Sequence, residues 1–290
     1  MALVTGPWPA RVTWALLPLT TGPSLGDALD DRSRSTMLTG SLLAWSAWSL
    51  VLVAVLVPRT ASLTALRIAA PAALGVAMWA ALDGERVATD AASVGWAALT
   101  LVAALAPTTG DCFVNGSSYG DERRMPLRVP GMLLLGPIQL AWIAAVGGPV
   151  GAPLLLASRQ WEAGAALALL GTPAAAVATR ALHSLSRRWV VLVPAGLVLH
   201  DLHALIDPIL FPRAQIRRLG PAPADGDGAR DLTQRSLGLA LEIELAQPVD
   251  IVPRRPDRTV SAEPVERLLF APTRPGAVMR EASKRHISVG

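Results

Sequence analysis

Cysteine and lysine are almost absent from this chain of 290 residues. Cys112 is the only cysteine, so an internal disulfide and a cysteine-based zinc site within one chain are both excluded. Lys284 is the only lysine among 26 basic residues, and the formal net charge of +4 is small. The sequence shows no basic stripe of the kind that binds nucleic acid, so we expect no nucleic-acid partner.

Charge is also scarce across the middle of the chain. Of the 48 charged side chains (26 basic and 22 acidic), only 15 lie in residues 38–180, whereas 27 lie from Ala181 onward. A lipid bilayer excludes charge, whereas a water-soluble domain needs charge over its whole surface. We therefore predict a transmembrane helical domain over residues 1–186 and a water-facing domain over residues 187–290.

Long apolar runs predict five or six membrane-spanning helices. Four of the runs cover residues 35–58, 63–82, 91–106 and 129–158. The last contains Gly147, Gly148, Pro149 and Pro153, which favour a turn, so a further helix is expected over residues 153–179. Residues 12–25 are apolar but interrupted by prolines, and they form either a sixth helix, which we favour, or an interfacial one.

Three polar residues are candidates for sites inside the membrane. Arg67 lies one turn inside its apolar segment, and snorkelling toward the interface explains it more simply than an ion or substrate contact. Arg159 and Glu162 lie three residues apart, on one face of the predicted helix, where they can pair. If residues 147–153 are only a kink, residues 159–162 form the loop between two helices instead.

Arginine placement predicts the orientation in the plasma membrane. Arg59, Arg67, Arg123, Arg124, Arg128 and the arginines that follow the last helix fall on one side, and Arg86 falls on the other. This bias places the C-terminal domain in the cytoplasm. With six crossings the N-terminus is cytoplasmic as well; with five it is outside.

Short strands replace the apolar runs from Arg188 onward. Residues 189–193 and 197–201 predict two strands around the turn Pro194-Ala195-Gly196, and residues 209–219 allow one or two more. Apolar residues alternate from Leu237 to Leu245, which predicts one strand with a single buried face. Residues 249–252 and 266–271 predict two further strands, residues 220–231 a loop, and residues 273–286 a final helix.

This order of six or seven short strands and a closing helix resembles a PH-like barrel. The resemblance is carried by the hairpin at residues 189–201, the alternating strand at 237–245, and Leu268-Leu269-Phe270-Ala271-Pro272 before the helix. Behind several membrane helices, the pattern is similar to that of actinobacterial multi-pass membrane proteins with a C-terminal bacterial PH-like domain. It covers residues 187 to about 289.

The resemblance implies a domain that binds lipid headgroups, peptides or proteins and has no catalytic role. Members that bind phosphoinositides use basic residues around the loop between the first two strands. Here that turn, Pro194-Ala195-Gly196, is short and uncharged. The resemblance therefore carries over no inositide site.

The connection at residues 108–128 is the best candidate contact loop for a partner protein or a lipid. It is longer than a helical bundle requires and contains the only tyrosine. It lies on the same side as the C-terminal domain, because two crossings separate them. The alternative is a solvated loop whose arginines only set the orientation. The candidate contact residues are Asn115, Tyr119, Asp121, Glu122, Arg123, Arg124 and Arg128.

The sequence carries no catalytic signature that we can identify: it has no phosphate-binding glycine loop with its lysine, no Gly-x-Ser-x-Gly and no His-Glu-x-x-His. Asp83, Glu85 and Asp90 are interpreted as a polar connection, and His200 and His203 are not expected to bind metal. No cofactor is expected.

We therefore expect a non-catalytic integral membrane protein, an anchor, scaffold or accessory subunit of a membrane complex. Its PH-like domain is expected to bind a partner protein or an anionic lipid, or to form homo-oligomers. The alternative function is a small transporter or envelope-biosynthesis subunit that binds a lipidic substrate in its helical bundle. A cavity shared by Arg67, Arg159 and Glu162 would favour that alternative.

Overall fold

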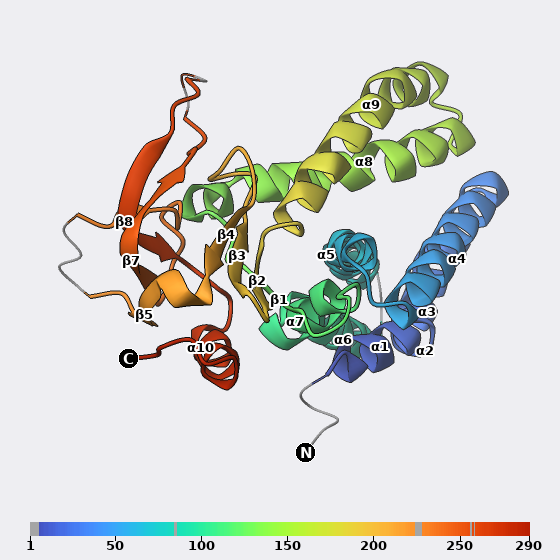
Figure 1. Ribbon diagram of the computed structural model, residues 1–290. Helices are drawn as coiled ribbons and strands as arrows, with labels where there is room; N and C mark the ends of the chain where they lie inside the picture. The colour runs from blue at the N-terminus through green and yellow to red at the C-terminus, as the bar shows by residue number, and fades with distance from the viewer. Residues whose placement is uncertain (1–5, 84–85, 224–227, 256, 258) are drawn as a thin grey trace. The chain divides into compact units, whose positions relative to one another are not determined.

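The computed structural model describes residues 6–83, 86–223, 228–255, 257 and 259–290 (Figure 1). The chain divides into two compact units that are each discontinuous in sequence. The helical unit comprises Met1–Gly116 and Pro137–Ser184, and the β unit comprises Ser117–Gly136 and Leu185–Gly290. The chain therefore passes between the units three times, and the β unit includes a separate segment of 20 residues, Ser117–Gly136, that precedes the last two long helices.

Among the described residues, five helices of the helical unit are long and apolar enough to cross a membrane, which supports a multi-pass membrane protein. Large apolar side chains such as Leu42, Leu50 and Val102 are exposed, as expected of helix faces that meet lipid. A shorter helix, α7 (Pro107–Asn115), follows the third long one. The five long helices are α4 (Arg34–Leu56), α5 (Thr60–Asp83), α6 (Val87–Leu105), α8 (Pro137–Ala157) and α9 (Trp161–Leu185).

The helix break predicted at residues 147–153 is wrong, because α8 continues through Pro149 and Pro153. Membrane helices tolerate proline where neighbouring groups satisfy the freed backbone. The glycines serve close packing instead of a turn: a Cβ atom on Gly148 would lie 2.5 Å from the backbone of Gly171 in α9. The alternative placement of an interhelical turn at this point is observed in part: Arg159, at φ 63°, lies between α8 and α9, whereas Glu162 belongs to the first turn of α9.

The apolar segment near the N-terminus forms three short helices instead of one continuous crossing. These are α1 (Trp8–Ala15), α2 (Leu17–Thr20) and α3 (Gly22–Asp30), each with a proline in its first two positions. Pro18 has no N–H to donate to the carbonyl of Trp14. That carbonyl accepts a bond from the Trp48 indole at 3.1 Å, and the Trp14 indole donates to the Trp48 carbonyl at 3.1 Å.

The β unit contains two four-stranded sheets, and the described residues form no closed barrel, so a PH-like fold is not confirmed. The helix α10 (Pro275–Lys284) follows the strands, as predicted. The first sheet has the order β1 (Arg123–Pro126), β2 (Trp189–Val193), β3 (Gly196–His200) and β4 (Ile209–Pro212). The second has the order β5 (Ile216–Pro221), β7 (Leu241–Ile251), β8 (Glu263–Phe270) and β6 (Arg230–Asp231).

The alternating strand begins later than predicted. β7 starts at Leu241, and Leu237 and Leu239 are exposed. Gly238 has φ +98°, a conformation that is incompatible with an extended strand. The carbonyls of Leu237 and Leu239 accept hydrogen bonds from the Arg128 guanidinium instead of from a neighbouring strand.

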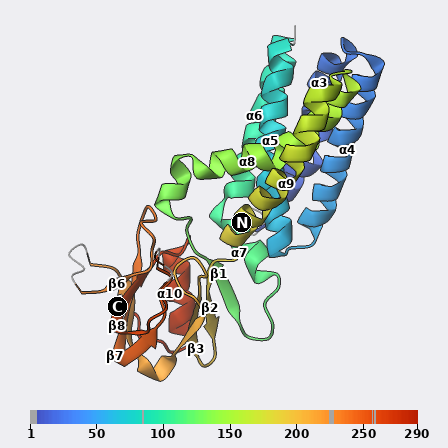
Figure 2. The same ribbon diagram turned by 90° about the horizontal axis from the view of Figure 1, so that it is seen from above.

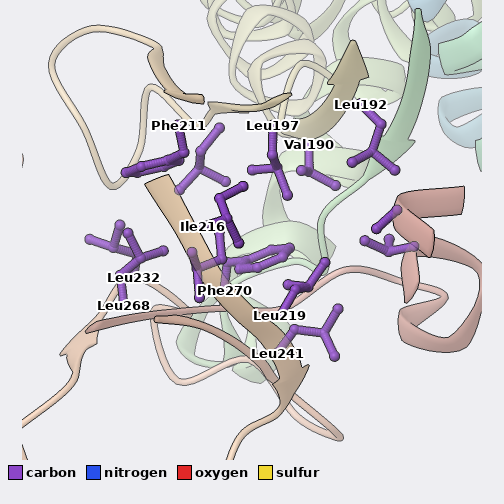
Figure 3. Packing of buried hydrophobic residues seen from close by; sticks show 14 of the residues in the cluster. Val190, Leu192, Leu197, Phe211, Ile216, Leu219, Leu232, Leu241, Leu268 and Phe270 are labelled. Carbon is purple, nitrogen blue, oxygen red and sulfur yellow. The ribbon is translucent and has the colours of Figure 1, made fainter. Parts of the chain in front are cut away.

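Both sheets and α10 contribute to one hydrophobic core, seen in Figure 3. Val190, Leu192 and Leu197 come from the first sheet, and Leu241 and Phe270 from the second. Val278 and Ala282 of α10 are fully buried in this core. Met125 and Leu127, from the segment before α8, also belong to it, so the core depends on both sequence segments of the unit.

Candidate functional site

The predicted contact loop is largely built into the β unit. Its residues 123–126 form β1, an edge strand that pairs antiparallel with β2. The Leu127 amide donates to the carbonyl of Arg188 at 3.0 Å, and the Arg128 amide donates to that of Ala271 at 2.8 Å. Asn115 belongs to the helical unit, at the end of α7, whereas the other six predicted contact residues belong to the β unit.

Two of the loop arginines have structural partners. Arg124 pairs with Glu122 at 2.7 Å, and its guanidinium lies 5.7 Å from the centre of the Trp189 ring. Arg128 holds the carbonyls of Leu237 and Leu239 at 2.8 and 3.3 Å. These contacts give both arginines structural partners within the β unit.

The remaining loop residues are more accessible. Tyr119 is 90% exposed, Asp121 is exposed and Arg123 is half-buried. The carbonyl of Asp121 accepts a hydrogen bond from Arg285 at 2.6 Å. Among the predicted contact residues, Asp121 is the one that the structure places beside a basic cluster.

The three predicted intramembrane residues do not converge. Arg67 donates to the carbonyl of Ala104 at 3.5 Å, near the C-terminal end of α6, where helix carbonyls lack intrahelical donors. Arg159 lies in the turn between α8 and α9, and Glu162 lies in the first turn of α9. The turn lies beside the start of α4, where the Ser35 hydroxyl donates to the carbonyl of Ala157 at 2.7 Å, whereas Arg67 lies near the start of α5, which follows the end of α4.

A buried ion pair holds the start of the first sheet, and the sequence did not reveal it. The Arg188 guanidinium donates two hydrogen bonds of 2.7 Å to the two carboxylate oxygens of Asp201. The two side chains are 2% and 1% exposed, and Arg188 also donates to the carbonyl of Arg128 at 2.7 Å. Both carboxylate oxygens of Asp201 are therefore hydrogen-bonded to Arg188. The His200 ring stacks on the Trp189 ring, with the ring centres 4.7 Å apart.

The best candidate binding site is a basic hollow of about 330 Å³ around the turn between β2 and β3. The turn itself is uncharged, as the sequence indicates. The cations of the hollow come from Arg213 of the 3-10 turn η3 (Arg213–Gln215) and from the C-terminal end of α10. Asp121, Pro194, Arg213, Lys284, Arg285 and His286 line the hollow.

The charge of this basic hollow is only partly neutralised. Glu281 accepts from Arg285 and from Lys284, the latter at 3.4 Å. Partial burial raises the pKa of Glu281, but the hydrogen bonds and charges of Arg285 and Lys284 lower it more, so the pKa lies below its usual value. Arg213 and Lys284 remain exposed. Arg213, Lys284 and Arg285 line the hollow together with one carboxylate, Asp121, and Glu281 pairs with two of these three cations.

A second hollow, of about 530 Å³, is less suited to binding a charged ligand. It is lined by Arg230 and Arg267 among others, and both are already paired. Arg230 contacts Glu263 at 2.8 Å, and Arg267 contacts Glu242 at 2.6 Å. The hydrogen bond and charge of Glu242 raise the pKa of Arg267, so that guanidinium stays charged and engaged.

Comparisons of the chain with protein-family models, with curated proteins and with solved structures found no match. The resemblance to membrane proteins with a PH-like domain therefore depends on the sequence pattern alone. The geometry of the basic hollow is the stronger guide to function.

Proposed function

We propose that this protein is a non-catalytic membrane anchor whose β unit binds an anionic group in the cytoplasm. The basic hollow carries the proposal. Guanidinium and ammonium groups are the usual protein ligands of phosphates and carboxylates. Arg213 and Lys284 are exposed beside an uncharged turn, so an anion can approach them without displacing a buried ion pair.

The distribution of arginine supports the cytoplasmic side. The segments of the β unit that flank the helices carry Arg123, Arg124, Arg128, Arg187 and Arg188. The turns at the other ends of the long helices carry fewer, namely Arg32, Arg34, Arg86 and Arg159. Positive residues are favoured in cytoplasmic segments close to membrane helices.

The ligand is a phosphate or a carboxylate, carried either by an anionic lipid headgroup or by an acidic segment of a partner protein. Both sources offer oxygen atoms to the same two exposed cations. The full chain, purified in uncharged detergent, is tested against two probes: phosphatidylglycerol in mixed micelles, measured by native mass spectrometry, and a fluorescent glutamate-rich peptide, measured by anisotropy.

We expect the wild type to bind one of the probes and the double variant Arg213→Glu/Lys284→Glu to bind it at least about tenfold more weakly, the effect of losing about 1.4 kcal/mol. The matched control is Arg217→Glu, which reverses an exposed charge paired with Glu244 outside the hollow. Binding of neither probe, or equal loss in the control, refutes the proposal. Lipid binding alone identifies a headgroup site, and peptide binding alone a protein partner.

A further inference from the structure

The N-terminal segment runs the length of the helical unit beside α4 and α6. Near its start, Arg11 donates to the carbonyl of Val55 at 2.9 Å, at the end of α4. The Trp96 indole, in the middle of α6, donates to the carbonyl of Thr13 at 2.9 Å. Asp27, near its end, pairs with Arg86 at 2.9 Å, just before α6. Figure 2 shows α3 and α6 reaching the same end of the bundle.

These contacts make the segment antiparallel to α6 and comparable in length to a crossing. Residues 13–27 lie along residues 96–86, and α3 also packs against α5. The segment is thus a sixth traverse of the unit, broken at Leu16 and Thr21. Broken membrane helices persist where they are buried in protein or line a polar cavity.

Four buried polar side chains lie between the two contacts at Thr13 and Asp27. Thr21 and Ser24 are 7% and 2% exposed, and Asp90 and Ser93, near the start of α6, are 6% and 0% exposed. The helix α3 packs against α6, and the Asp27–Arg86 pair joins the end of the N-terminal segment to the residue just before α6. The Thr21, Ser24 and Ser93 hydroxyls and one carboxylate oxygen of Asp90 have no hydrogen-bond partner among the described residues. Thr21 stands at the N-cap of α3, yet its hydroxyl does not cap that helix.

The neighbouring charged groups do not serve Asp90. Arg86 is paired with Asp27, and Arg32 is paired with Asp83. The last two turns of α5, which packs against α3 and α6, contribute the buried alanines Ala77 and Ala80. Glu85 lies outside the described residues. A buried carboxylate in this position needs a counter-charge, because an isolated buried charge costs several kcal/mol.

We propose that Thr21, Ser24, Asp90 and Ser93 bind a single alkali-metal cation. One monovalent cation neutralises the one carboxylate and contacts several oxygen atoms together. A proton on Asp90 would let its carboxyl group donate only one hydrogen bond. A water molecule would leave the negative charge of the carboxylate without a counter-charge. The four side chains offer oxygen alone, whereas transition metals favour nitrogen or sulfur ligands, and Ca²⁺ takes six to eight oxygens.

The test measures thermal unfolding of the full chain in uncharged detergent, in NaCl, KCl or choline chloride at equal ionic strength and pH. We expect Na⁺ or K⁺ to raise the Tm of the wild type in a saturable way, because a ligand that binds only the folded state stabilises it. Asp90→Asn is expected to remove this response without lowering the Tm in choline chloride. Ser93→Ala is expected to shift the half-saturating concentration upward at least threefold.

The matched control is Asp83→Asn, which removes an exposed carboxylate at the end of α5 and is expected to keep the cation response. A Tm that does not depend on the cation, or a response that persists in Asp90→Asn, overturns the proposal. A Tm that depends on pH alone also overturns it, because Asp90 then takes a proton. The basic hollow lies in the other unit, so this result and the anion-binding result are independent.

Discussion

The buried ion pairs of the β unit differ from the buried polar groups around the start of α6 in the helical unit. In the β unit, buried Arg188 and Asp201 satisfy each other with two short hydrogen bonds, and Glu242, also buried, is held by Arg267. In the helical unit, Asp90 and three hydroxyls are buried to a similar degree, and each has a polar atom without a hydrogen-bond partner among the residues that the structure describes. The comparison teaches that burial alone does not mark a functional residue. What distinguishes Asp90 is burial without a partner.

The largest effect is expected from cutting the β unit at its apparent sequence boundary. Residues 187–290 expressed alone lack β1 and the buried side chains of Met125 and Leu127, each worth about 2–5 kcal/mol as a truncation in a core. We expect this fragment not to fold, as judged by circular dichroism and amide-resolved NMR. Typical domains have only about 5–15 kcal/mol of stability to lose.

A fusion of residues 117–136 to residues 185–290 through a flexible linker of about 20 residues is the control, and it is expected to fold. If the shorter fragment folds as well as the fusion, the segment before α8 is not required for the core, and the β unit is less interdependent than its packing indicates.

A smaller loss is expected from breaking the buried pair. Arg188→Met leaves Asp201 buried and uncompensated, which costs about 3–5 kcal/mol. Hydrogen exchange of β2 and β3 in the full chain, followed by mass spectrometry, should then accelerate by at least about 100-fold. Arg188→Met/Asp201→Leu should recover most of the loss, since both charges are gone. Equal acceleration of hydrogen exchange in the single and double variants would show that the unpaired charge of Asp201 is not the cause of the destabilisation.

The smallest effect is expected at the basic hollow. The pKa of Glu281 is held below its usual value of 4.5, so its contribution to stability is present at neutral pH and is lost as the pH falls through the lowered pKa. In Glu281→Gln, the loss of stability of α10 between neutral and acid pH should therefore be smaller than in the wild type by about 0.5 kcal/mol, the size of a helical i,i+4 pair. The measurement is the rate of proteolysis of α10 between pH 3 and 7. A rate that changes with pH as steeply in Glu281→Gln as in the wild type contradicts the prediction.

The sequence predicts the elements better than their assembly. The length of each apolar run is enough to predict the long helices, because the thickness of a bilayer sets the length of a segment that crosses it. The hairpin at residues 189–200 is predicted from the turn residues between its strands. The prediction of a turn at Gly148 is wrong because the sequence alone does not distinguish a glycine in a turn from a glycine at a contact between two helices. The close approach of Gly148 to Gly171 in α9 is visible only in the structure. Asp90 was interpreted as part of a polar connection because its burial depends on α3, which is distant in sequence.

The basic hollow was missed for a related reason. Lys284, Arg285 and His286 follow one another at a helix end, where cations are common for dipole and capping reasons. Arg213 joins them only through the fold. Periodicity describes each element by itself, whereas a site depends on which elements meet.

The two-part construction of the β unit imposes an order on biosynthesis. β1 leaves the ribosome before α8 and α9, and its partner β2 follows only after both helices have been made. Its edge and the apolar side chains of Met125 and Leu127 therefore have no partner from β2 until that strand has been made. The first sheet can thus be completed only after the last two long helices have left the ribosome.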